Sequence, residues 1–322
     1  MRLAKAVLLA TTILSTGISS AKADVNVMAS IKPIHSLVSA VMEGVGKPSL
    51  IIEGAGSPHT YALKPSQAAE LQDANLIFWV GHDLETFLEK PIEGLASEAV
   101  AITLSNAHGL TKIKFREGGA FDSHDHDDHD DHGDHDDHDD HDDHDDHAGH
   151  EGHNHGEFDA HIWLDPSNAK EMVHEIAHEL GDLDPANKDK YEANAEATII
   201  ALDQLIKDVS KDINKDAKFV VFHDAYQYFE ERFGVRAAGA LTLNTDVLPG
   251  AKQIDEIQDV IKDRGINCIF SEPQFNPKII STIAEDTNIK TGVFDPLGAN
   301  INSDKDLYFK LISNLGNELK GC

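Results

Sequence analysis

The stretch from Asp122 to His155 places the strongest limit on how this chain of 322 residues can fold. It holds twelve histidines and fifteen aspartates, and a His-Asp-Asp triplet recurs from His129 to His147 with one interruption. Because its largest apolar side chain is that of Ala148, the stretch has nothing to bury and cannot offset the entropy of becoming ordered. We therefore expect a disordered loop, with the folded structure built on either side of it.

Imidazole and carboxylate groups side by side also make this loop able to bind divalent metal ions. Imidazole is a preferred ligand of Zn, Cu and Ni, and a plain acidic linker has no need of histidine at a fixed period. We expect the loop to collect metal ions with low affinity. Its histidines are His124, His126, His129, His132, His135, His138, His141, His144, His147, His150, His153 and His155.

The formal net charge of −30 is concentrated in the same region. Residues 118–157 carry fifteen Asp and two Glu with no Lys or Arg, so more than half of the excess negative charge lies there. Such a surface repels nucleic acid and attracts cations. The composition therefore argues against a nucleic-acid partner.

The N-terminus has the three parts of a secretory signal. Arg2 and Lys5 supply the charged region, residues 6–14 the apolar core, and residues 21–23 an Ala-Lys-Ala cleavage site. The apolar run is too short to span a membrane, and no later segment is apolar enough to do so. We expect cleavage after Ala23, which removes residues 1–23 and leaves a mature chain outside the cytoplasm and not inserted in the membrane.

Short apolar runs alternate with helical patterns on both sides of the loop. Residues 76–80 are continuously apolar, which is typical of a parallel strand buried on both faces. The alternation predicts an α/β fold of two lobes, each a mainly parallel sheet of about four strands with flanking helices. The expected strands cover residues 25–31, 49–53, 76–80, 100–104, 219–222, 235–241, 268–271 and 291–294.

One long helix should connect the two lobes. Asp184 and Pro185 are suited to its N-cap and first turn, and apolar residues then recur at steps of three or four. No further Gly or Pro interrupts this pattern, so the helix should be rigid. We expect a first lobe over residues 24–183, a linking helix over 184–213 and a second lobe over 214–322.

Ligands of open α/β sheets bind beyond the carboxyl ends of the strands. Several polar residues are expected there, and their positions in the sequence alone do not show which of them bind a ligand. For His35, His82 and His108 we favour a hydrogen-bonded structural role. The candidates at strand ends are His35, His59, His82, His108, His161, His223, Glu272 and Asp295.

Residues 174–178 match the H-E-x-x-H pattern of zinc proteases. On a helix, His174 and His178 fall on the polar side, opposite the apolar Met172 and Ile176. A protease would bury this polar side in its active site. We interpret the match as chance on a solvated helix face, and a zinc metallopeptidase that uses His174, Glu175 and His178 is the weaker alternative.

Cys268 and Cys322 are the two cysteines of the chain. In an oxidising compartment an even number favours one disulfide, which would tie the last residue to an inner strand. Two free thiols are the alternative.

Several motifs resemble those of the periplasmic zinc-binding proteins of ABC importers, the ZnuA type. The likeness covers essentially the whole mature chain, including a His-rich loop between the first and second ligand motifs. It implies two α/β lobes joined by one long rigid helix, with metal in the cleft between them. The motifs are GAGSPHTYALKPS at 54–66, HIWLDP at 161–166, FHDAYQYF at 222–229, and SEPQF at 271–275 with DPLG at 295–298.

Carried over from this resemblance, His59 and His161 are metal ligands from the first lobe and His223 is a ligand from the second. Asp295 stands where many relatives supply a carboxylate as fourth ligand, a place that water can take in zinc-type members. Glu272 would lie just behind the ligands. Three imidazoles suit tetrahedral Zn²⁺, whereas Mn²⁺ prefers more oxygen.

Two positions depart from the family pattern. Gln67 stands where the family usually has Asp, and the sequence attaches no consequence to it. Ala240 stands where some relatives have a histidine of a second metal site, so we do not expect that site here. The pair Cys268 and Cys322, in contrast, matches a disulfide of the family.

The resemblance implies capture and delivery of Zn²⁺ in the periplasm. The protein would bind the ion tightly near neutral pH and pass it to the membrane permease of an ABC importer, which works with a cytoplasmic ATPase. It would act as a monomer and carry out no catalysis. A periplasmic zinc buffer or metallochaperone without a permease partner is the alternative.

Overall fold

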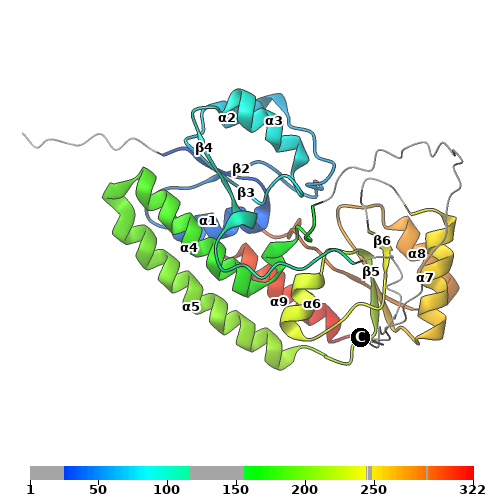
Figure 1. Ribbon diagram of the computed structural model, residues 1–322. Helices are drawn as coiled ribbons and strands as arrows, with labels where there is room; N and C mark the ends of the chain where they lie inside the picture. The colour runs from blue at the N-terminus through cyan, green and yellow to red at the C-terminus, as the bar shows by residue number, and fades with distance from the viewer. Residues whose placement is uncertain (1–24, 117–155, 244, 246–248, 288) are drawn as a thin grey trace, which may run out of the picture.

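Two four-stranded sheets, one in each lobe, form the framework of the computed structural model (Figure 1). The structure describes residues 25–116, 156–243, 245, 249–287 and 289–322. The expected signal peptide, residues 1–23, and the His/Asp-rich loop, residues 122–155, lie outside the described residues. Both sheets are parallel, so the predicted fold class is confirmed.

The first sheet has the strand order β2-β1-β3-β4. All four residues of its inner strand β3 are buried, as expected for an apolar run covered on both faces. The outer strands are shorter or more exposed because only one side is paired. The bounds are β1 Val27–Ala29, β2 Ser49–Leu50, β3 Leu76–Trp79 and β4 Val100–Thr103.

The second sheet repeats the pattern with the order β6-β5-β7-β8. Its inner strand β5 is buried along its whole length and ends at His223, so the sheet carries this imidazole at its carboxyl edge. A disulfide joins Cys268, the first residue of β7, to Cys322, which confirms the predicted pair. The bounds are β5 Phe219–His223, β6 Ala240–Thr242, β7 Cys268–Ser271 and β8 Lys290–Val293.

The helices of the first lobe begin where proline and capping groups place them. Asp165 caps α4 by accepting a hydrogen bond from the backbone N–H of Ser167 at 2.7 Å, with proline in the first turn. The helix α2 begins at Pro65, with Lys64 at its N-cap position. The bounds are α1 Lys32–Val41, α2 Pro65–Gln72, α3 Thr86–Leu95 and α4 Pro166–Leu183, with 3-10 turns at Leu104–Asn106 and Ile162–Leu164.

The long helix α5 covers Lys188–Asp212 and runs from the end of α4 to the second lobe (Figure 1). It begins later than the sequence pattern indicates, because Pro185–Asn187 forms a separate 3-10 turn. Asp184 stands at the N-cap position of this 3-10 turn, with Pro185 in the first turn, and Asn187 is the N-cap residue of α5. The Asp184 carboxylate accepts hydrogen bonds from Asn187 Nδ2 and the Tyr191 hydroxyl. At 1.5 Å per residue, α5 is roughly 37 Å long.

A second connection between the lobes was not foreseen. The C-terminal helix α9, Leu307–Leu319, follows the second sheet in the chain but packs against α1 and α5. The segment that leads to it is held by the buried Lys32, whose Nζ donates to the carbonyl oxygens of Gly298 at 2.7 Å and Ala299 at 2.9 Å. The lobes are therefore fastened by more than the long helix.

Three shorter helices complete the second lobe. They flank its sheet, and α6 lies on the side that faces the first lobe (Figure 1). Among the residues that the structure describes, no helix is long and apolar enough to cross a membrane. The bounds are α6 Gln227–Phe233, α7 Ala251–Asp263 and α8 Lys278–Thr287.

Candidate metal centre

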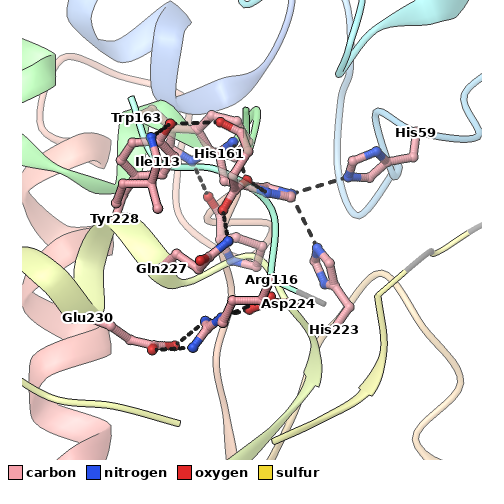
Figure 2. Close-up of polar contacts among 12 residues, drawn as sticks. His59, Ile113, Arg116, His161, Trp163, His223, Asp224, Gln227, Tyr228 and Glu230 are labelled. Carbon is pink, nitrogen blue, oxygen red and sulfur yellow. Dashed lines mark hydrogen bonds and ion pairs between the residues drawn. The ribbon is translucent and has the colours of Figure 1, made fainter. Parts of the chain in front are cut away.

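Three imidazoles converge between the lobes (Figure 2). His59 comes from the loop between β2 and α2, His161 directly precedes the 3-10 turn Ile162–Leu164, and His223 ends β5. The Nε2 atom of His161 lies 3.3 Å from Nε2 of His59 and 3.3 Å from Nε2 of His223. Of the described residues, these three form the group of His, Cys, Asp and Glu whose ligand atoms all lie within 4.8 Å of one another.

The two separations that involve His161 suit a tetrahedral ion. Two nitrogen ligands at about 2.0–2.1 Å from Zn²⁺, with a tetrahedral angle between them, lie roughly 3.3–3.4 Å apart. The observed separations of 3.3 Å match this value. The ligand atoms of all three residues lie within 4.8 Å of one another, so the three imidazoles can face one ion.

Carboxylates on the far side of two rings fix their orientation. Glu272 accepts from His223 Nδ1 with both oxygens, at 2.7 and 2.8 Å, and Asp159 accepts from His161 Nδ1 at 2.6 Å. A proton held at Nδ1 leaves the lone pair of Nε2 free, and in both residues that atom points to the common centre. Glu272 thus lies behind a ring as expected, whereas Asp159 was not among the predicted site residues. An Asp two residues before a candidate ligand is the only sequence feature that could have indicated it.

Burial and charge act in opposite directions on His223. Its side chain is 5% exposed, and this desolvation by itself lowers the pKa of the imidazole. The adjacent carboxylate of Glu272 outweighs burial and raises the pKa above its ordinary value. His161 is also buried, while His59 is half-buried on its loop. A metal ion at this centre therefore has to displace a proton from His223 as the pH falls.

Asp295 holds a turn in this structure. Its carboxylate accepts hydrogen bonds from the backbone N–H groups of Leu297 at 3.1 Å, Gly298 at 3.0 Å and Ala299 at 2.6 Å. A fourth donor is Nε2 of Gln274, at 3.0 Å. Gly298 has a φ of 67°, so the tight turn suits a residue without a side chain. Both Asp295 oxygens are thus engaged, and Asp295 is not in the convergent group.

The other histidines of the described chain lie apart from this centre. His35 is buried and its Nε2 is 3.1 Å from the carbonyl oxygen of Pro48, in keeping with the structural role expected for it. His82 pairs with Glu89 at the surface, and His108 is exposed. The H-E-x-x-H histidines, His174 and His178, are both exposed on α4, as the helical pattern predicts for a solvated face.

Gln67 has a structural role that the sequence did not indicate. Its buried side chain donates to the carbonyl oxygen of Ile51 at 2.5 Å and accepts from the backbone N–H of Lys64 at 2.9 Å. It also makes a hydrogen bond with the Tyr61 hydroxyl. Gln67 therefore ties together the two ends of the loop that carries His59.

Two α/β lobes, each with a parallel sheet, and a centre of three imidazoles between them define a metal-binding protein of the solute-binding type. Residues 27–322 match the ZnuA family, described as zinc-uptake complex component A, periplasmic. The high-affinity zinc uptake system protein ZnuA of Brucella abortus (strain 2308) is 54% identical over 303 residues, which cover 92% of this chain and 91% of the relative. The chain belongs to the ZnuA family.

Solved structures share the fold. A crystal structure of ZnuA superposes with a TM-score of 0.71 at 22% identity, over 92% of this chain and 99% of that one. The laminin-binding protein Lmb of Streptococcus agalactiae has a TM-score of 0.70 at 25% identity, again over 92% and 99% of the two chains. Lmb is described as a bifunctional protein with adhesin and metal-transporting activity.

Proposed function

We propose that this protein captures Zn²⁺ at His59, His161 and His223 and delivers the ion to the permease of an ABC importer. The observation that carries the proposal is the convergence of three imidazoles whose ligand atoms lie within 4.8 Å of one another. Two of the separations, from His161 to His59 and to His223, match those of a tetrahedral zinc site. Membership of a family described by zinc uptake supports it. The function follows from binding alone, and the proposal includes no catalysis.

The charge of the centre suits a divalent cation. The three imidazoles bind as neutral ligands, and the carboxylates of Asp159 and Glu272 stand behind two of them. Two negative charges in a buried site offset the charge of Zn²⁺, which a neutral site would bind at a large desolvation cost. The same carboxylates make the rings more basic and therefore stronger ligands.

We assign the fourth position on the ion to water. Asp295 is the protein group that the family pattern suggests, but its oxygens already accept four hydrogen bonds. If this carboxylate turned to the ion, the backbone N–H groups of the turn at Gly298 would lose their hydrogen-bond acceptor. A water ligand also provides a position that a receiving site can occupy when the ion is transferred.

Delivery takes place in the periplasm in this proposal. The signal sequence supports export, and the family description places its members there. The permease, its cytoplasmic ATPase and the monomeric state of the protein are carried over from the family. The His/Asp-rich loop would collect zinc with low affinity close to the tight site.

Calorimetric titration with Zn²⁺ in the presence of competing Mn²⁺ tests the proposal. We expect one tight Zn²⁺ site that Mn²⁺ does not displace, and we expect His59→Ala, His161→Ala and His223→Ala each to weaken it strongly. His174→Ala on the exposed face of α4 is the matched control and should leave it unchanged. Tight binding that survives all three substitutions at the centre would contradict the proposal.

Transport separates an importer component from a zinc buffer without a permease. Deletion of the gene should impair growth when zinc is scarce, and the wild-type chain should restore it. A chain with His161→Ala should not restore it, although it keeps the loop. Normal zinc uptake without the protein would favour the buffer.

A further inference from the structure

The carboxylate of Asp159 accepts hydrogen bonds from both lobes, from His161 in the first and from Gln227 in the second. Its Oδ1 accepts from Nδ1 of His161 at 2.6 Å and from the His161 backbone N–H at 3.0 Å. Its Oδ2 accepts from Nε2 of Gln227, the first residue of α6 in the second lobe, at 3.1 Å. The Asp159 side chain has no exposed surface, so these are its partners in place of water.

We infer that Gln227 is a positioning residue for zinc capture, acting on His161 through Asp159. The inference deepens the proposed function and rests on it. A buried carboxylate with one oxygen unsatisfied would rotate or draw in water, and the ring of His161 would lose its fixed direction. Gln227 prevents this by occupying the second oxygen.

A neutral amide is the suitable donor at this position. Gln227 satisfies Oδ2 without cancelling the negative charge of Asp159, so the charge remains available to His161 and to the bound cation. Lysine or arginine would also donate to Oδ2, but its positive charge would repel Zn²⁺ at a buried site. The chemistry of the residue therefore favours a role in metal binding over one in stability alone.

The neighbouring Tyr228 strengthens the same connection. Its hydroxyl donates to the backbone carbonyl oxygen of Asp159 at 2.8 Å and accepts from the backbone N–H of Ile113 at 3.1 Å. The backbone N–H of Asp159 in turn donates to the carbonyl oxygen of Ile113 at 2.8 Å. Asp159 is thus held at its backbone and at both carboxylate oxygens, and α6 supplies two of these contacts.

The three ligand imidazoles differ in which lobe supplies the groups that orient them. Glu272, which orients His223, belongs to the same lobe as that ring. His161 is oriented by Asp159 of its own lobe, and the second lobe contributes through the bond from Gln227 to Asp159. His59 lies on a first-lobe loop that Gln67 ties to β2 and α2. Loss of the contact between Gln227 and Asp159 releases the ring of His161, so this one inter-lobe contact, rather than lobe packing in general, is coupled to zinc affinity.

Substitution of Gln227 in the full chain tests this inference. We expect Gln227→Leu to lower the affinity of the tight Zn²⁺ site about 10–100-fold, measured by competition with a chromophoric chelator that outcompetes the weak loop sites. Gln227→Glu has the same shape but replaces a donor with an acceptor beside Asp159, and it should also lower the affinity. Visible absorption of bound Co²⁺ should weaken in both variants as the tetrahedral geometry is lost.

Arg232 provides the matched control. It also lies on α6 and forms an inter-lobe pair, donating to Asp165 at 2.6 and 2.8 Å, but Asp165 accepts no bond from a ligand imidazole. Arg232→Leu should therefore lower the melting temperature of the apo-protein while leaving zinc affinity and the Co²⁺ spectrum unchanged. Melting curves of the Gln227 variants show whether they fold.

Two outcomes would contradict the role of Gln227, and a third would contradict the proposed function. Wild-type affinity in folded Gln227→Leu and Gln227→Glu overturns the inference and leaves the proposed function intact. Equal losses in Arg232→Leu and Gln227→Leu also overturn it, because general lobe packing would then control affinity. If His161→Ala binds Zn²⁺ as tightly as the wild type, the proposed function itself fails.

Discussion

Arg116 and Asp224 form a two-bonded ion pair that is shielded from solvent between the lobes (Figure 2). Arg116 Nε donates to Asp224 Oδ2 at 3.0 Å and Nη2 to Oδ1 at 2.5 Å, while Nη1 donates to Glu230 at 2.9 Å. The side chains of Asp224 and Glu230 are only 4% and 6% exposed. Asp224 follows the ligand His223, so the pair fastens the segment before residue 117 next to the metal centre.

Loss of the guanidinium should therefore destabilise the protein strongly. Arg116→Leu leaves two buried carboxylates without a cation, and removing one partner of such a group typically costs about 3–5 kcal/mol. We expect a loss of this size in the free energy of unfolding, measured by urea denaturation at neutral pH. Lys114→Leu is the control, because its pair with Glu157 is exposed and contributes about 1 kcal/mol or less.

The effect of Arg116→Leu should also depend on pH. Burial raises the pKa of both Asp224 and Glu230 above its ordinary value, even with the arginine present. Without that cation the carboxyl groups bind protons more readily, so acidification should reduce the stability difference between variant and wild type. A difference that grows as the pH falls from 7 to 5 would show that the two carboxylates are not the cause.

Zinc affinity should fall on acidification earlier than for an ordinary histidine. Glu272 raises the pKa of His223 despite its burial, so protons begin to compete with the metal above about pH 6.5. In Glu272→Gln the imidazole loses this charge, and the acid loss of affinity should move to lower pH. At pH 8, where protons no longer compete, the variant should bind Zn²⁺ about 10–100-fold more weakly than the wild type.

Chelator competition between pH 5.5 and 8.5 measures both parts of this prediction. Glu231→Gln is a suitable control, because Glu231 lies on the exposed side of α6. The prediction fails if Glu272→Gln has the pH profile of the wild type, or if its affinity at pH 8 is unchanged.

Glu85 is a second buried carboxyl group, and it lies apart from the three imidazoles in the first lobe. It accepts hydrogen bonds from the backbone N–H groups of Val80 at 3.3 Å and Gly81 at 2.9 Å, and from the Ser30 hydroxyl. Burial raises its pKa to about 7, although these hydrogen bonds oppose the shift. Between pH 4.5 and about 7, the Glu85 carboxyl group therefore stays mostly protonated in the folded protein, whereas in the unfolded chain it is mostly ionised.

Glu85→Gln should gain stability relative to the wild type as the pH rises. A raised folded-state pKa contributes stability that is fully present below the unfolded value of 4.5 and is lost as the pH rises to about 7. The neutral amide has no such loss, so the difference should shift in its favour by at most about 3 kcal/mol between pH 4.5 and 7. Melting temperatures across this range, with the exposed Glu70→Gln as control, measure the shift; parallel curves would contradict it.

The sequence indicates the parts of this structure that depend on local pattern. The continuous apolar runs of β3 and β5 identify inner parallel strands, and the motifs around His59, His161 and His223 identify the centre. Contacts between distant segments could not be predicted in this way. The hydrogen bond from Gln227 to Asp159 joins residues 68 apart in the chain.

Two other misses have physical causes of the same kind. The C-terminal helix α9 packs on α1 and α5 of the first lobe, and Lys32 holds the segment that leads to it. Neither contact has a local sequence signal, because each joins residues more than a hundred positions apart or in different lobes. Asp295 carries the family's ligand position, but the turn at Gly298 brings three backbone N–H groups to its carboxylate. Only the conformation of that turn shows how those oxygens are used.

Deletion of residues 122–155 should separate collection of zinc from its tight binding. Twelve imidazoles leave with the loop, so the number of Zn²⁺ ions bound should fall sharply. The antiparallel bridge between Lys114 and Phe158, together with the bonds of Arg116 and Asp159, holds both ends of the deleted segment in place. Residues 117–121, 156 and 157 remain to close the chain, a connection longer than the shortest hairpin loops.

The tight site and the melting temperature of the apo-protein should consequently stay nearly unchanged in this deletion, while uptake suffers mainly when zinc is scarce. Calorimetry measures the stoichiometry and the tight affinity in one titration. Replacement of the loop histidines by asparagine at full length is the control, because it removes the ligands but keeps the chain. If either variant abolishes tight binding, the loop supplies a primary ligand and His59, His161 and His223 do not complete the protein's share of the site.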